Sequence, residues 1–372
     1  MLLMLLSCSG PQAAAETKEP MARSQDFLAT RPLYEQPLDE GTTPVPGLAN
    51  LSAETCGACH VEQLADWKLR THSHAWTDRQ FQAEITKSGN RWLCLNCHTP
   101  LQIQHDRLPV GLEDEDVERP VLIDNPHFDE GLREEGITCA ACHVKDGVIH
   151  GPGSSTGAAP HPVQASQDFV DNEVCLRCHQ AVATYPGKGF VCTFETGDEW
   201  RAGPYDDEGK GCIDCHMPEG RHWWRGAGIP KVAGVHPPAE ANPPGLGLDV
   251  VWGDTLGLTM TNANAGHKLP SGDPERWVQV TVTFAPGGEE HVERIGQVWE
   301  WWPEPKKLSD NRLAPRESRT VQVPIPDGAT GATVVATSHR ITAEIIEYHG
   351  LEGYPDQIET HRLELKPPVS GD

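Results

Sequence analysis

The sequence is short of positive charge, of methionine and of long apolar stretches. Its 372 residues include 30 Lys and Arg against 54 Asp and Glu, a formal net charge of −24. No basic face could survive that balance, so we exclude a nucleic-acid-binding function. Apart from a short apolar start, no segment is long enough to cross a membrane. Large apolar side chains are also sparse between residues 51 and 235, which leaves little to fill an interior there.

Cysteine, in contrast, is plentiful and patterned. Ten of the twelve Cys belong to five copies of the pentapeptide C-x-x-C-H. Two thiols at this spacing lie on one side of a turn, where each can form a thioether to a haem vinyl group, and the next residue places an imidazole under the iron. We therefore predict five covalent haems c, attached through Cys56, Cys59, Cys94, Cys97, Cys139, Cys142, Cys175, Cys178, Cys212 and Cys215, with His60, His98, His143, His179 and His216 as proximal ligands.

Two other uses of the C-x-x-C spacing fit less well. Structural zinc sites combine two such pairs, or one pair with two His, and five pairs cannot combine two by two. Zinc also gives no reason for a His directly after every second Cys. A thioredoxin-type motif needs one copy beside a βαβ unit, and none is visible. Thioether attachment and the abundance of Cys both indicate a location outside the cytosol.

The second axial ligand of each iron decides between electron transfer and catalysis. Thirteen of the 18 His remain once the five motif His are assigned, whereas there are only five Met. We therefore expect mostly bis-His, low-spin haems, whose geometry changes little on reduction.

Several segments resemble a known family. The region Cys56–Phe81, in which Trp67 precedes Thr71-His72-Ser73-His74-Ala75, resembles the first haem segment of multihaem cytochromes related to the tetrahaem acceptor of hydroxylamine oxidoreductase. Residues 135–143, 215–218 and 265–273 are similar to further segments of that family. The resemblance implies a haem-packed helical domain with a β-sandwich appended. It also implies His72, with His74 as its rival, as a haem ligand, and it fixes no substrate.

The distal ligands are predicted one by one. Besides His72 or His74, we expect His267 in a Gly-rich loop between strands, and His161 and His222 in their Pro- and Trp-flanked segments. The fifth is open among His105, His127, His150 and His236, with His150 favoured because it follows the third motif closely. If no fifth His binds, one haem would be five-coordinate.

The predicted fold class is α+β: a loop-rich, mainly helical, haem-packed domain followed by an antiparallel β-sandwich. The expected parts are a lipoprotein-type signal (1–8), a flexible linker (9–50), a pentahaem cytochrome c domain (51–235), a Pro/Gly linker (236–247) and the sandwich (248–372). The signal ends in Leu5-Leu6-Ser7-Cys8, which predicts Cys8 as a lipidated anchor. The sandwich is expected from the alternating runs 277–284, 319–325 and 332–336.

The function that we expect is electron transfer by an exported, lipid-anchored relay, periplasmic, associated with the outer membrane or at the cell surface. The strong acidity favours basic redox proteins as partners, or it only keeps an exported protein soluble. Two alternatives stay open: an oxidoreductase of a small nitrogen or sulfur compound at one open haem, and a subunit of an extracellular cytochrome filament. No catalytic residue is predicted, and whether the chain is an enzyme is left open.

Overall fold

The computed structural model describes residues 12–39, 41–87, 92–153, 159–185, 191–232, 235, 241–301 and 303–368. Its contacts divide the chain into two compact units. The first comprises Met1–His60, His72–Thr77 and Phe81–Ser166, and the second comprises Val61–Thr71, Asp78–Gln80 and Gln167–Asp372. The first unit therefore carries the first three motifs, and the second carries the fourth and fifth motifs together with the C-terminal strands. The sequence had predicted a single boundary at residues 236–247.

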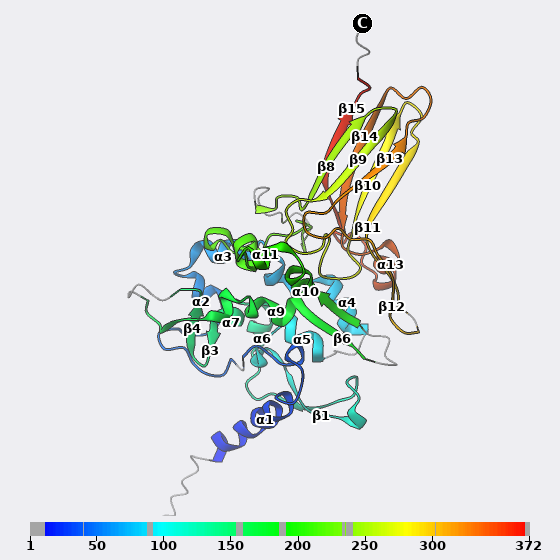
Figure 1. The fold of residues 1–372 in the computed structure, drawn as a ribbon. Coiled ribbons are helices and arrows are strands. Elements are labelled where there is room, and N and C mark those ends of the chain that lie inside the picture. The colour runs from blue at the N-terminus through cyan, green and yellow to red at the C-terminus, as the bar shows by residue number, and fades with distance from the viewer. Residues whose placement is uncertain are drawn as a thin grey trace, which may run out of the picture. The chain divides into compact units, whose positions relative to one another are not determined.

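The first unit is built from short helices and small sheets (Figure 1). Its helices are α1 (Gln12–Leu28), α2 (Ala53–Gly57), α4 (Arg79–Lys87, from Phe81 onward), α5 (Trp92–His98), α6 (Glu130–Glu134) and α7 (Cys139–His143), with 3-10 turns η1 (Leu33–Glu35), η2 (Thr71–His74, from His72 onward), η3 (Gln102–Gln104) and η4 (Glu113–Glu115). Strands β1 (Arg107–Leu112) and β2 (Pro120–Asp124) pair antiparallel, β3 (Val144–Lys145) pairs antiparallel with β4 (Val148–Gly151), and β4 pairs parallel with β5 (Val163–Ala165).

Helix α1 lies where the sequence predicted a linker. Met21 and Leu28, seven residues apart and hence on one helix face, are buried, and Gln102 Nε2 donates to Ser24 Oγ at 3.0 Å. We did not predict this helix, because its apolar stripe is narrow and the overall composition of residues 9–50 is that of a linker. The part of the expected linker before residue 12, and Cys8 with it, lies outside the described residues.

The segment from Glu54 to Trp76 forms three short elements, α2, α3 (Val61–Lys68) and η2. Helix α2 begins at a capped position, because the Ser52 hydroxyl accepts from the Glu54 amide at 3.2 Å. The division falls at Ala58–His60, where the end of the first motif leaves the helix.

The second unit begins with haem-motif helices and a hairpin. Its helices are α3, α8 (Gln167–Val170), α9 (Glu173–His179), α10 (Thr196–Arg201), α11 (Pro204–Asp207), α12 (Cys212–His216) and α13 (Ala343–His349), with the 3-10 turn η5 (Pro218–Gly220). Strands β6 (Gln180–Thr184) and β7 (Val191–Glu195) pair antiparallel.

The rest of this unit is an antiparallel sandwich (Figure 1). One sheet has the order β12-β11-β10-β14-β15 and the other β13-β9-β8. Its strands are β8 (Leu246–Trp252), β9 (Thr255–Asn262), β10 (Trp277–Ala285), β11 (Glu290–Glu300), β12 (Lys306–Asp310), β13 (Ser318–Pro324), β14 (Gly331–His339) and β15 (Gln357–Leu365). The three alternating runs of the sequence fall on β10, β13 and β14, and the predicted α+β fold is confirmed.

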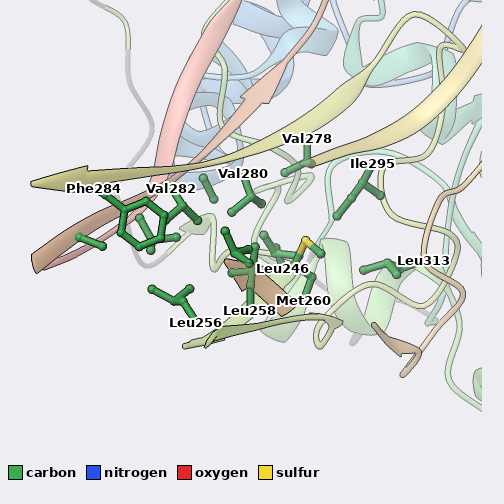
Figure 2. Close-up of a cluster of buried hydrophobic side chains, with 14 residues drawn as sticks. Leu246, Leu256, Leu258, Met260, Val278, Val280, Val282, Phe284, Ile295 and Leu313 are labelled. Carbon is green, nitrogen blue, oxygen red and sulfur yellow. The ribbon is translucent and has the colours of Figure 1, made fainter. Parts of the chain in front are cut away.

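The sandwich has a continuous apolar core, shown in Figure 2. Val278, Val280, Val282 and Phe284 point inward from β10, and each is at most 3% exposed. They meet side chains of the other sheet such as Leu258, which is fully buried. At about 1.5–3 kcal/mol for each buried large apolar side chain, this core is the main apolar contribution to the folding of the unit.

The motif-bearing part of the second unit has no such core. Neither of the two clusters of buried hydrophobic side chains found in the described residues includes a residue from 167–232. That is the pattern expected if porphyrins supply the apolar interior there. Within the described residues, no helix has the length and apolarity of a membrane span.

Candidate haem-binding sites

All five motifs lie on or beside short helices, α2, α5, α7, α9 and α12, and the last four of these helices end at the motif His. One helical turn puts the two cysteines of a motif on the same face. None of the ten motif cysteines forms a disulfide in the structure. Across the described part of the chain, no three His, Cys, Asp or Glu side chains converge as a zinc site would require.

Glu135 links the first motif to the third. Its carboxylate accepts hydrogen bonds from the Ser52 hydroxyl at 2.5 Å, the Ala53 amide at 2.8 Å and the Thr138 hydroxyl at 2.7 Å. The thiols of Cys56 and Cys139 are in hydrogen-bond contact, which raises the pKa of Cys139. The first cysteines of these two motifs are therefore neighbours in space.

Asn172 links the fourth and fifth motifs in the same way. Its Oδ1 accepts from the Cys212 amide at 2.7 Å, and it is 3% exposed. A Cβ on Gly211 would lie 2.6 Å from that oxygen, so only glycine allows this approach. Hydrogen bonding from Cys175 lowers the pKa of the Cys212 thiol, so these two cysteines are also in contact.

Four of the candidate imidazoles are held by a backbone carbonyl at Nδ1. The carbonyl can only accept, so Nδ1 carries the hydrogen and Nε2 keeps its lone pair for a metal. The four are His98 (to Ala75 O, 2.8 Å), His143 (to His150 O, 2.7 Å), His222 (to Gly220 O, 3.0 Å) and His267 (to Lys268 O, 2.9 Å). The His98 ring is also stacked on Phe81, with centroids 3.7 Å apart and an angle of 5°.

Two pairs of imidazoles lie at the separation that one iron requires. The ring centroids of His60 and His161 are 6.5 Å apart, and those of His216 and His267 are 6.2 Å apart. A metal–nitrogen bond of about 2.0–2.1 Å puts the metal roughly 3.2 Å from the ring centroid, so two rings on one iron have centroids about 6.4 Å apart. The donor set and its spacing fit haem iron in both places.

Tight backbone packing positions the second member of each pair. A Cβ on Gly47 (φ +89°) would lie 2.0 Å from Pro160 O, so the segment that carries His161 rests directly on glycine backbone. The loop that carries His267 is held by the buried Asn262, whose Nδ2 donates to His267 O at 2.8 Å.

Burial keeps several of these imidazoles neutral, as a metal ligand must be. It lowers the pKa of His179 and of His216 to about 4, and it also lowers the pKa of His143 and His267. The residue His179 as a whole is exposed.

The structure also describes the surroundings of the other predicted distal ligands. His72 lies in η2, where its carbonyl accepts from the Ile137 amide at 3.1 Å, and Gly136 (φ +63°) permits that approach. His74 is in the same turn. The His222 ring lies edge-on to Trp224, with centroids 5.1 Å apart. His150 orients His143 through its carbonyl oxygen, which is a role that the sequence did not suggest.

The remaining candidates for a fifth distal ligand differ sharply from these. His105 is 4% exposed, its Nε2 donates to Thr99 O at 2.8 Å, and burial lowers its pKa to about 4, so it is a neutral core residue. His127 is exposed, and His236 lies outside the described residues. The sequence pattern missed the roles of Glu135, Asn172 and Phe81; the only signal for the first two was their position three or four residues before a motif cysteine.

Helix-borne C-x-x-C-H motifs together with imidazole pairs at haem spacing are the features of a multihaem c-type cytochrome. Residues 55–121 match the family model described as cytochrome c554 and c-prime. The fold is similar to the crystal structure of a penta-heme cytochrome c552 from Thermochromatium tepidum, with a TM-score of 0.63 and 16% identity over 85% of this chain and 98% of that chain. No curated protein matches the sequence. The motifs and the family-model match support a multihaem c-type cytochrome, and the structural match shows a similar fold. The closer relation to the tetrahaem acceptor of hydroxylamine oxidoreductase stays a prediction.

Proposed function

We propose that this chain is a pentahaem c-type cytochrome that transfers electrons. The observation that carries the proposal is the separation of 6.5 Å and 6.2 Å in the two imidazole pairs, which suits one bis-His iron each. A bound haem iron takes up and releases one electron. The residues around it hold the imidazoles by Nδ1 hydrogen bonds and ring stacking, and rings held in this way move little when the charge on the iron changes.

The ligand assignments follow from that geometry. His60 with His161 would hold the haem attached at Cys56 and Cys59. His216 with His267 would hold the haem attached at Cys212 and Cys215. His98, His143 and His179 are the proximal ligands of the other three, and His72, His74, His150 and His222 stay the candidates for their distal positions.

The contacts between motifs favour a relay over isolated centres. Cys56 touches Cys139 within the first unit, and Cys175 touches Cys212 within the second. Haems attached at touching cysteines are neighbours, and closely spaced haems exchange electrons rapidly.

The surroundings of the protein are part of the proposal. Thioether haem attachment and the resemblance to exported cytochromes favour the periplasm or the outer face of the cell. Cys8 would carry a lipid that anchors the chain. The net charge of −24 favours a basic redox protein as the partner.

Three measurements on the purified holoprotein test this function and its alternatives. The intact mass should exceed that of the polypeptide by five haem groups, and the electron paramagnetic resonance spectrum should show low-spin iron only. A mass with fewer haems refutes the pentahaem assignment. A high-spin fraction that shifts when nitric oxide or hydroxylamine is added indicates the oxidoreductase instead. Light scattering that reveals long polymers indicates the filament.

A further inference from the structure

We propose that the carboxylate of Glu135 lowers the reduction potentials of two haems, those attached at the first motif (Cys56–His60) and at the third motif (Cys139–His143). The inference rests on the proposed function, since it needs haems at these motifs. It assigns to a residue outside the motifs a role in the energetics of two of the five haems.

Glu135 lies where the helices of the first and third motifs begin. Ser52 is the N-cap of α2 and Thr138 is the N-cap of α7, and their hydroxyls donate to the Glu135 carboxylate at 2.5 Å and 2.7 Å. The third donor is the amide of Ala53, the first residue of α2, at 2.8 Å. Thr138 directly precedes the third motif, and Ala53 lies three residues before the first motif. The carboxylate therefore contacts the segment that leads into each motif.

The pattern of donors is that of an ionised carboxylate. Oε1 of Glu135 accepts from the Ser52 hydroxyl, and Oε2 accepts from the Ala53 amide and the Thr138 hydroxyl. An amide N–H can only donate, and an ionised carboxylate can only accept. Hydrogen bonds of this kind stabilise the charged form of the group. Glu135 therefore places a fixed negative charge between the two motifs.

No cation compensates this charge within the described part of the first unit. The three donors are neutral, and no lysine or arginine there forms an ion pair with Glu135. Arg133 is engaged elsewhere, since its Nη1 lies 3.5 Å from Asp106 Oδ1 and its Nη2 lies 4.0 Å from Glu130 Oε1. Two of the donor residues, Ala53 and Thr138, are each only 1% exposed. Solvent therefore screens the charge little on the side that faces the motif helices.

A fixed negative charge makes a nearby haem harder to reduce. Reduction adds one electron to the haem, and charges of the same sign repel each other. Helices α2 and α7 are in contact, so one carboxylate acts on the haems of both motifs. Both potentials should therefore be lower than they would be beside a neutral residue.

The other pair of touching motifs has a neutral group at the corresponding place. Asn172 precedes the fourth motif by three residues and accepts from the Cys212 amide, at the start of the fifth motif, at 2.7 Å. Its side-chain amide has no net charge. Asp214, inside the fifth motif, is exposed to solvent, which screens its charge. The charge of Glu135 should therefore favour the residence of electrons on the second-unit pair of haems.

The test is a redox titration of the holoprotein followed by paramagnetic NMR, in which the methyl signals of each haem report its own potential. Glu135→Gln keeps the shape of the side chain and removes its charge. It should raise the reduction equilibrium constant of two haems by about tenfold each, a shift of about 59 mV to higher potential for one electron. Glu134→Gln is the matched control, because this neighbouring carboxylate is exposed and accepts from Trp76 Nε1 at 3.1 Å. It should move all five potentials much less.

A second variant, Thr138→Val, separates the charge from the structural link between the motifs. It removes one hydrogen bond of the carboxylate with a side chain of the same shape, and it leaves the charge with fewer donors. The same two potentials should therefore fall. If they rise in Thr138→Val as they do in Glu135→Gln, the link between the motifs sets them and the inference is wrong.

The remaining outcomes separate the inference from the proposed function. Five haems with unmoved potentials in Glu135→Gln overturn the inference and leave the proposed function intact. Equal shifts in Glu134→Gln also overturn it, because net charge alone would then explain the effect. A wild type with fewer than five haems overturns the proposed function instead. If Glu135→Gln attaches fewer haems, Thr138→Val decides: a fall of the two potentials supports the inference, and no change or a rise refutes it.

Discussion

The imidazoles of His216 and His267 lie with their centroids 6.2 Å apart and their planes 17° apart. His216 ends the helix of the fifth motif, and His267 belongs to the loop between β9 and β10. One haem would therefore join the cytochrome-like and sandwich-like parts of the second unit through its two axial bonds.

Replacement of His267 should open that haem. His267→Ala removes the distal imidazole, so about one fifth of the total iron should become high-spin, with a matching charge-transfer band in the visible spectrum. His291→Ala, in the same sandwich, removes a ring that hydrogen-bonds Glu293 at 2.7 Å and should leave the spectrum unchanged. An entirely low-spin spectrum in His267→Ala would show that the pair does not share an iron.

Replacement of His105 should change the stability of the fold and leave the haem spectra unchanged. His105→Leu leaves Thr99 O without its donor and should destabilise the fold by about 1–3 kcal/mol, because a buried acceptor loses its partner. All haem spectra should stay as in the wild type. Denaturant unfolding followed by circular dichroism, together with the visible spectrum, measures both; a high-spin signal here would contradict the structural role.

The buried ion pairs of Arg312 should matter for stability. Arg312→Met leaves the buried Glu199 without its cation and Asp310 with Lys268 alone, at a cost of about 3–5 kcal/mol, because an isolated buried charge is expensive. Arg319, half-exposed beside Glu317 at 3.2 Å, is the control, and Arg319→Met should change the unfolding midpoint little. Equal effects of the two substitutions would mean that burial does not strengthen the Arg312 pairs.

The ionisation of Asp310 should make the stability of the protein depend on pH. Burial raises its pKa, but the hydrogen bonds and charge of Arg312 and the hydrogen bond of Lys268 outweigh this effect, so the net pKa is well below the usual range. A depressed folded pKa contributes stability that is fully present above the unfolded value of about 3.9 and is lost as the pH falls through the folded value. Asp310→Asn should therefore be less stable at pH 7 and show a shallower loss of stability in acid.

The measurement is the thermal midpoint of the holoprotein between pH 7 and pH 2. Asp327→Asn, in an exposed loop, should follow the wild-type curve. If the thermal midpoints of Asp310→Asn and of the wild type fall in parallel as the pH is lowered, Asp310 does not contribute to the loss of stability in acid.

Removal of the haems should unfold the motif-bearing part of the second unit, residues 167–232, and leave the sandwich folded. A chain in which the ten motif cysteines are Ser should leave residues 167–232 open to protease, since no apolar cluster holds them. The sandwich should survive as a protected fragment because its core contains no motif residue. Cleavage throughout β8–β15 at the same rate would show that the sandwich depends on the haems.

The C-x-x-C-H motifs and the strands of the sandwich could be recognised in the sequence because both have short-range signals. A C-x-x-C-H motif fits within one helical turn, and alternation in β10 is visible residue by residue. The sequence pattern missed helix α1, whose apolar stripe is narrow. It also missed the grouping of the fourth and fifth motifs with the sandwich.

Long-range relations were harder to predict because no local pattern encodes them. His161 and His267 were identified as candidates, but their partners depend on packing such as Gly47 against Pro160 and Asn262 against the His267 loop. His105 and His150 were both candidates for the fifth distal ligand in the sequence, with His150 favoured for its position after the third motif. Only hydrogen bonding separates them, since one ring is tied up at Nε2 and the other residue acts through its carbonyl.

The contacts of Cys56 with Cys139 and of Cys175 with Cys212 also bear on biogenesis. An attachment enzyme has to reach both cysteines of a motif, and half-buried thiols that touch another motif offer it no room. If haems are attached at these cysteines, we therefore expect the thioethers to form on the extended polypeptide, before the chain folds.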